Sequence, residues 1–185
     1  MAYDVEAESR ALIAHGLTGD PVRLSRRRRF AAVAVDVDGD VACTRFVRRS
    51  VGSFEHMCHV LVRRGADWVY LGGGGSGAET DGLEDRPGAW ELGGHVVVQG
   101  SGGVADDAGR RMPWGGRWIS YAELRVSAAV ASVHVGDRVL PVPRHGHVVV
   151  VWTGRRAPVA VAHGADGRPL AGVGLPGRRS PAELR

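Results

Sequence analysis

The chain has 185 residues, enough for one domain with a sizeable hydrophobic core. Hydrophobic residues make up 44% of it and charged residues 24%, an ordinary globular composition that excludes a largely disordered chain. All 24 basic residues are arginine, and neither lysine nor asparagine occurs, as is typical of a GC-rich bacterium. Because 20 acidic residues leave a net charge of only +4, overall charge does not by itself indicate a nucleic-acid-binding protein.

The first residues, 1–9, are acidic and carry neither the basic nor the apolar region of a secretory signal. No apolar run approaches the roughly 20 residues that span a bilayer. We therefore expect a soluble, cytoplasmic protein that does not enter a membrane. In a reducing compartment we expect Cys43 and Cys58 to be free, buried thiols rather than a disulfide.

Residues 3–17 combine apolar and acidic positions at helical spacing, which predicts one short amphipathic helix. The pattern then changes to period two on both sides of Asp38-Gly39-Asp40, which predicts a β-hairpin. We favour a three-residue turn, because it pairs Val35 with Cys43 and keeps one continuous valine face.

A second hairpin is expected from Glu55 to Leu71, and its first strand is apolar on both faces, as in a central strand. The Gly-rich segments 72–88 and 100–116 are interpreted as loops around a strand at 94–99. Further strands are expected over 124–135, 138–142, 147–153, 158–162 and 168–173.

Short strands at this spacing are typical of sandwiches and barrels. We predict an all-β fold, an antiparallel β-sandwich with a short N-terminal α-helix, as a single domain over residues 1–175. The Pro- and Arg-rich residues 176–185 are expected to form a flexible tail.

Residues 33–40 read Val-Ala-Val-Asp-Val-Asp-Gly-Asp and resemble the nucleophile motif of haloacid-dehalogenase-like phosphatases. The resemblance implies that Asp36 is a nucleophile and Asp38 a general acid, both helping to hold a magnesium ion. However, position 40 is Asp where the family has Thr or Val, and the chain lacks the family's lysine and its alternation of strands and helices. We therefore interpret the segment as a hairpin turn with solvated carboxylates.

Gly72–Gly77 has the glycine spacing of a dinucleotide-binding fingerprint, but the acidic, breaker-rich residues after it do not predict the helix that would receive a pyrophosphate. His56, Cys58 and His59 are candidate metal ligands. On a strand only His56 and Cys58 share a face, so packed or surface histidines are the favoured interpretation. No cofactor is expected, and no metal site beyond the weak candidates His56 and Cys58.

Arg26–Arg29 enter the first strand, and the hairpin brings them near Arg48 and Arg49, so one hairpin end is strongly basic. Such a cluster needs a partner, either acidic residues of the chain such as Glu6 and Glu8 or an external anion. The Trp-containing segment 110–118 is a second expected contact surface.

We predict a non-enzymatic interaction or accessory protein that binds another macromolecule, with a protein carrying an acidic or phosphate-bearing surface as the expected partner. Self-association into a homo-oligomer is also compatible with the sequence. The alternatives are a small-ligand-binding sandwich or barrel, enzymes included, with His59 or His95 in an apolar cavity, and backbone-directed nucleic-acid binding. The expected binding residues are Arg26, Arg27, Arg28, Arg29, Arg48, Arg49, Arg111, Trp114 and Trp118.

Overall fold

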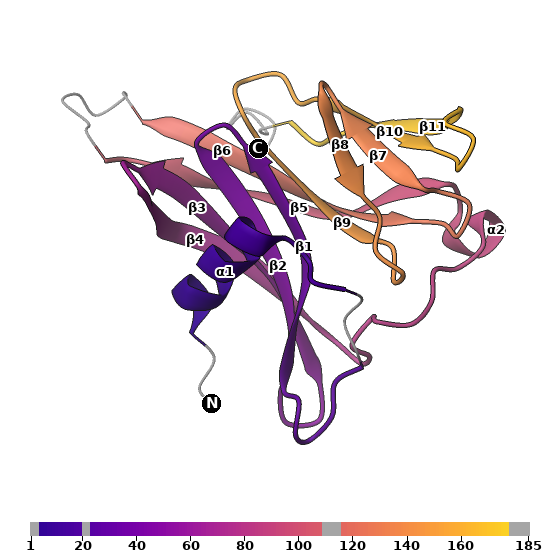
Figure 1. Ribbon diagram of the computed structural model, residues 1–185, viewed down its shortest axis with the longest axis horizontal. Coiled ribbons are helices and arrows are strands. Elements are labelled where there is room, and N and C mark those ends of the chain that lie inside the picture. Colours follow the sequence, from indigo (N-terminus) through magenta and orange to yellow (C-terminus); the bar gives the residue numbers. More distant parts are fainter. Residues whose placement is uncertain (1–3, 20–22, 109–115, 178–185) are drawn as a thin grey trace, which may run out of the picture.

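The computed structural model describes residues 4–19, 23–108 and 116–177, which form three antiparallel sheets and a short N-terminal helix (Figure 1). Sheet A has the order β1-β2-β3-β4, sheet B the order β5-β6-β9, and sheet C the order β11-β10-β7-β8. The predicted all-β fold with one short N-terminal helix is confirmed. The elements are α1 (Val5–His15), β1 (Phe30–Asp38), β2 (Val41–Arg49), β3 (Phe54–Arg64), β4 (Asp67–Ala78), α2 (Ala89–Leu92), β5 (Val96–Asp106), β6 (Arg117–Val126), β7 (Ser132–Val135), β8 (Arg138–Pro141), β9 (His147–Thr153), β10 (Val159–His163) and β11 (Pro169–Gly174).

Sheet B is the middle layer, because its strands supply alternate residues to two separate cores (Figure 1). In β9, Val149 and Val151 pack with sheet A, whereas Val148 and Val150 pack with sheet C. Successive side chains of a strand point to opposite faces, so both faces of sheet B are buried. Sheets A and B also meet at their edges, where β1 lies beside β9 and β4 beside β5. Strands therefore close the space between these two sheets along both edges.

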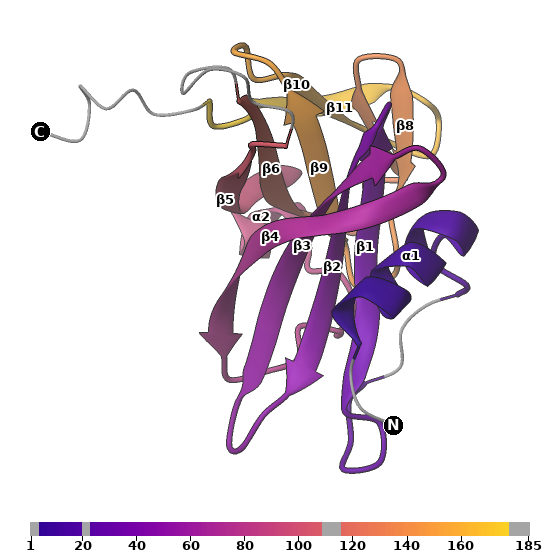
Figure 2. The same ribbon diagram turned by 90° about the vertical axis from the view of Figure 1, so that its left-hand side faces the viewer.

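Helix α1 packs against β1, β2 and β4 of sheet A (Figure 2). It begins at Asp4, whose side chain accepts the backbone N–H groups of Glu6 and Ala7, and it ends before Gly16. Its buried Ser9 hydroxyl lies 2.8 Å from the Thr44 hydroxyl of β2. The strand expected to be central, β3, lies between β2 and β4 and is buried on both faces, as predicted.

The first hairpin differs from the prediction in its register. Val35 pairs with Thr44 rather than with Cys43, because the turn has two residues instead of three. A bulge between Ala32 and Ala34 shifts the pairing again, and the valine face is not continuous. As a result Asp36, expected in solvent, is only 3% exposed.

Two segments interpreted as loops begin as strands. Strand β4 continues through the glycine run to Ala78, and β5 continues from residue 100 to Asp106. The reason is close packing: a Cβ at Gly73 would lie 1.9 Å from the Cys58 carbonyl oxygen, so only glycine lets this strand pair there.

The later strands follow the prediction in outline. The strand expected over 124–135 is interrupted, because β6 ends at Val126 and β7 begins at Ser132. Of the tail expected over 176–185, the part from residue 178 on lies outside the described residues. Among the described helices, none has the length and apolar character needed to cross a membrane.

Candidate functional site

The space between sheets A and B changes from apolar to polar at the same level on four strands. On β6 the residues on this face run from apolar to charged in the series Ile119, Tyr121, Glu123 and Arg125. On β9 the same face runs Val151, Val149 and His147; β2 runs Val41, Cys43 and Arg45; β3 runs Val62, Val60, Cys58 and His56. The polar half contains a cavity of about 700 Å³, which we call the inter-sheet pocket.

Arg45 is the most deeply buried charge of the inter-sheet pocket, at 4% exposed. Its Nη2 lies 3.0 Å from Glu123 Oε2, so strand β2 of sheet A is tied to strand β6 of sheet B by an ion pair. Its Nη1 donates to His147 Nδ1 at 2.8 Å. Burial of this guanidinium is therefore compensated by one carboxylate and one imidazole.

His147 lies between two guanidiniums, because Arg125 Nη1 contacts its Nε2 while Arg45 contacts its Nδ1. Burial lowers the pKa of His147, and the two nearby arginines lower it further, so the imidazole is neutral. Its Nε2 lies 3.1 Å from the carbonyl oxygen of Gly82, which can only accept, and also contacts the Arg125 guanidinium, which can only donate.

The segment that supplies Gly82 is anchored rather than a free surface loop. The buried Asp81 carboxylate accepts the backbone N–H groups of Leu24, at 2.8 Å, and of Leu83, at 3.3 Å. Gly82 has φ +64°, and a Cβ on it would lie 3.0 Å from His147 Nε2. Glycine is required here both by its backbone conformation and by the approach of the imidazole.

Glycines of β4 and β5 make room for the Tyr121 side chain. A Cβ on Gly74 would lie 2.5 Å from the Tyr121 hydroxyl, and a Cβ on Gly102 would lie 2.6 Å from it. Burial raises the pKa of Tyr121, so the hydroxyl is protonated and able to donate a hydrogen bond at neutral pH. The glycine-rich strands thus form one wall of the inter-sheet pocket rather than a phosphate-binding turn, and the dinucleotide interpretation is excluded.

The metal-ligand candidates separate in the structure. His56 and Cys58 share a face, as expected, but only His56 lines the inter-sheet pocket, with its Nε2 3.3 Å from the Thr80 carbonyl oxygen. Cys58 lies in the apolar core, and it and Cys43 are free thiols. Over the described ranges, no three side chains of the His, Cys, Asp and Glu types are grouped to hold a metal ion.

The other histidines named by the sequence lie elsewhere. His59 packs against the rings of Phe46 and Tyr70 on the other face of β3, where burial lowers its pKa to about 4. His95 Nδ1 lies 3.1 Å from the Ser127 hydroxyl. Neither His59 nor His95 lines the inter-sheet pocket, which is polar rather than apolar and is lined by His56 and His147.

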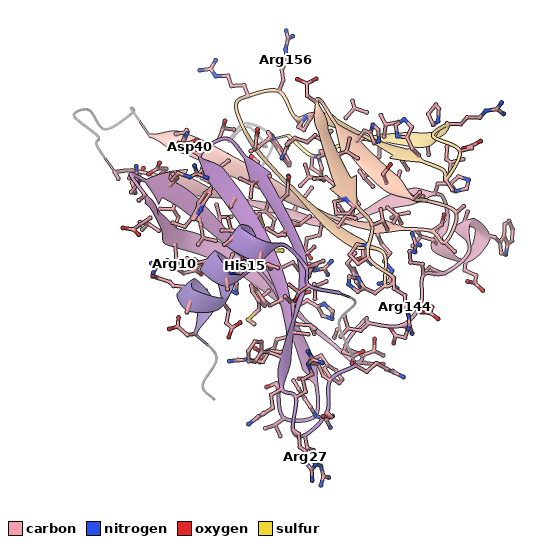
Figure 3. All side chains as sticks on the ribbon, viewed as in Figure 1. Arg10, His15, Arg27, Asp40, Arg144 and Arg156 are labelled. Atoms are coloured by element: carbon pink, nitrogen blue, oxygen red, sulfur yellow. The ribbon has the colours of Figure 1, made fainter. Side chains whose placement is uncertain are left out.

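The hairpin brings Arg29 beside Arg49 as predicted, since the Arg49 N–H donates to the Arg29 carbonyl oxygen at 2.7 Å, but the side chains of the cluster differ in their partners. Arg26–Arg29 are exposed, and Figure 3 shows Arg27 at the tip of the molecule farthest from Arg156. Arg48 is neutralised by Glu55 at 2.6 Å, and Arg49 stands over the ring of Phe54. Glu6, expected as a partner of this cluster, instead pairs with Arg10 within α1.

The predicted tryptophan surface is only partly described. Arg111 and Trp114 lie outside the described residues. Trp118 lies on β6 rather than in a loop, and it is half-buried beside Gly103, where an added Cβ would meet its indole nitrogen at 2.4 Å. Trp90 on α2 is 95% exposed.

Sequence reasoning missed four residues of the inter-sheet pocket, namely Arg45, Tyr121, Glu123 and Arg125. The available signal was the period-two pattern itself, in which charged residues take the places of inward-facing apolar ones. The fold and the pocket define an all-β, three-layered protein with a polar cavity between two sheets. Comparison of the chain with protein-family models, curated proteins and solved structures finds no match.

Proposed function

We propose that this protein binds a small polar molecule in the inter-sheet pocket. The proposal rests on one observation: charged and polar side chains from both sheets line a cavity of about 700 Å³, within the range of small-molecule sites. Buried charges cost stability unless they are paired, so a polar cavity in a β-sheet core is unfavourable without a use. Binding a ligand is the use that this arrangement supports best.

Blocking the inter-sheet pocket is expected to abolish binding. Ser76 lies opposite His56 across the β3–β4 pair, on the face that lines the cavity, so Ser76→Trp would fill it. A panel of small carboxylates, phosphates, amines and sugars at millimolar concentration, assayed by thermal shift and native mass spectrometry, is expected to give binders of the wild type that Ser76→Trp does not bind. Glu79→Trp, on the exposed segment beside the pocket, is the matched control and is expected to bind normally. Absence of any binder, or equal binding by Ser76→Trp, would contradict the proposal.

A second function is favoured by the exposed tip formed by Arg26–Arg29, since no ion pair in the described parts of the chain neutralises these four side chains. The tip carries four guanidiniums on consecutive residues, which suits an acidic partner surface. We propose that it docks an acidic segment of a partner protein.

Replacing Arg26–Arg29 together by alanine is expected to abolish salt-sensitive binding of a fluorescent poly-glutamate peptide, measured by anisotropy. Alanine at the exposed Arg155, Arg156 and Arg168 removes a similar charge elsewhere and is expected to leave binding largely unchanged. Preference for duplex DNA over the peptide would point to nucleic-acid backbone recognition instead. Binding that does not respond to salt would exclude both.

A further inference from the structure

The two arginines of the inter-sheet pocket are paired unequally. Arg45 and Arg125 are both at least nine-tenths buried, at 4% and 9% exposed. Glu123 pairs with Arg45, whereas no carboxylate within the described residues lies at ion-pair distance from Arg125. Glu84 also lines the pocket and its charge acts on Arg125, but it is more exposed and its ion-pair partner, at 3.8 Å, is Arg23.

The neighbours of Arg125 do not replace the missing carboxylate. A neutral imidazole has one acceptor nitrogen, so His147 can accept from only one of the two guanidiniums that flank it. Whichever ring nitrogen carries the lone pair, one of the two guanidiniums is left without that acceptor. The other acceptor beside Arg125 is the Gly82 carbonyl, to which its Nη1 donates at 3.1 Å. Its Nε and Nη2 groups have no hydrogen-bond partner among the residues that the structure describes.

An unpaired donor on the second arginine of the pocket supports the same conclusion. Arg45 Nε is buried and has no hydrogen-bond partner in the described chain. Native proteins rarely leave buried polar atoms unpaired, so each one requires an explanation. Arg45 lies on β2 and Arg125 on β6, so guanidinium N–H groups without an acceptor lie on both sheets.

We infer that the ligand of the inter-sheet pocket carries a carboxylate, which the guanidinium of Arg125 binds; this inference rests on the function proposed above. A carboxylate matches the planar fork of an arginine with two parallel hydrogen bonds. Glu123 is already paired with Arg45, so a carboxylate on the ligand would be the direct ion-pair partner of Arg125. A phosphate dianion would bring more negative charge beside Glu123 and Glu84, which also line the pocket.

The experiment compares small carboxylic acids with their primary amides, which have nearly the same shape but no charge. Benzoate with benzamide, lactate with lactamide and succinate with succinamide are suitable pairs, measured by calorimetry at pH 7.5. Acids are expected to bind the wild type about 10- to 100-fold more tightly than the matching amides. Arg125→Met is expected to remove that preference, and Arg168→Met, on an exposed turn, to keep it.

A second variant separates loss of charge from loss of structure. Glu123→Gln removes the negative charge and is expected to tighten carboxylate binding several-fold, the opposite of Arg125→Met.

If acids and amides bind equally well and Ser76→Trp abolishes the binding of both, the carboxylate inference is overturned and the proposed function stands. Binding that Ser76→Trp does not affect would overturn the proposed function itself. Tighter binding of phosphates than of carboxylates would also overturn the inference.

Discussion

Asp36→Ala is expected to lower the free energy of unfolding by about 3–5 kcal/mol, the cost of breaking a buried ion pair by removing one partner. The Asp36 carboxylate pairs with Arg138 of β8 and accepts the backbone N–H of Val151 of β9 at 2.8 Å. One side chain of sheet A thus holds the edge of sheet B and a strand of sheet C. Its loss leaves a guanidinium without its closest partner and a buried N–H without an acceptor.

Two further variants test this account by urea denaturation. Asp38→Ala is the matched control, because Asp38 is far more exposed and lies 3.9 Å from Arg138; its cost is expected to stay below about 1 kcal/mol. Asp36→Asn keeps an oxygen that can accept the Val151 N–H and is expected to fall between the two alanine variants. Equal stabilities of Asp36→Ala and Asp38→Ala would show that this pair does not hold the sheets together.

Asp36 illustrates which features of the fold can be predicted from the sequence and which cannot. The alternation of residues 33–47 predicts a hairpin, and the structure contains it. The buried face was predicted wrongly, because a bulge and a shorter turn depend on what packs against the strand. The carboxylate has the position that the phosphatase resemblance would give a nucleophile, yet burial raises its pKa while Arg138 and Val151 counteract that rise. Its partners lie on strands more than 100 residues later.

The inter-sheet pocket could not be predicted from the sequence, because it too depends on contacts between distant strands. Period two assigns Arg45 and Arg125 to strands, but the strand expected from residue 124 leaves out Glu123, and the pattern does not say which strands face one another across two sheets. Only the order of strands in sheets A and B brings the three side chains to one level. The local alternation of apolar and polar residues therefore predicts strands, whereas the site depends on contacts between residues about 80 positions apart in the sequence.

The glycine-rich composition of residues 72–77 wrongly predicted a loop. The second prediction with a large expected effect concerns one of these glycines. Gly73→Ala is expected to destabilise the protein by about 3 kcal/mol, the upper end of the usual cost of overpacking. The added methyl would lie 1.9 Å from the Cys58 carbonyl oxygen and 3.2 Å from the His59 Cα. Both atoms belong to the backbone of β3, which is buried on both faces, so β4 would have to move instead.

Gly77→Ala is the matched control, four residues further along the same strand. A Cβ there meets nothing within 4 Å, so this variant is expected to be neutral or to gain up to about 1 kcal/mol from reduced freedom of the unfolded chain. If urea denaturation shows a lower free energy of unfolding for Gly73→Ala and an unchanged or higher one for Gly77→Ala, close contact rather than flexibility requires glycine in β4. Destabilisation of similar size by both variants would contradict this. Because Gly74 and Ser76 on β4 line the inter-sheet pocket, displacement of the strand by Gly73→Ala is also expected to weaken ligand binding, whereas Gly77→Ala leaves it intact.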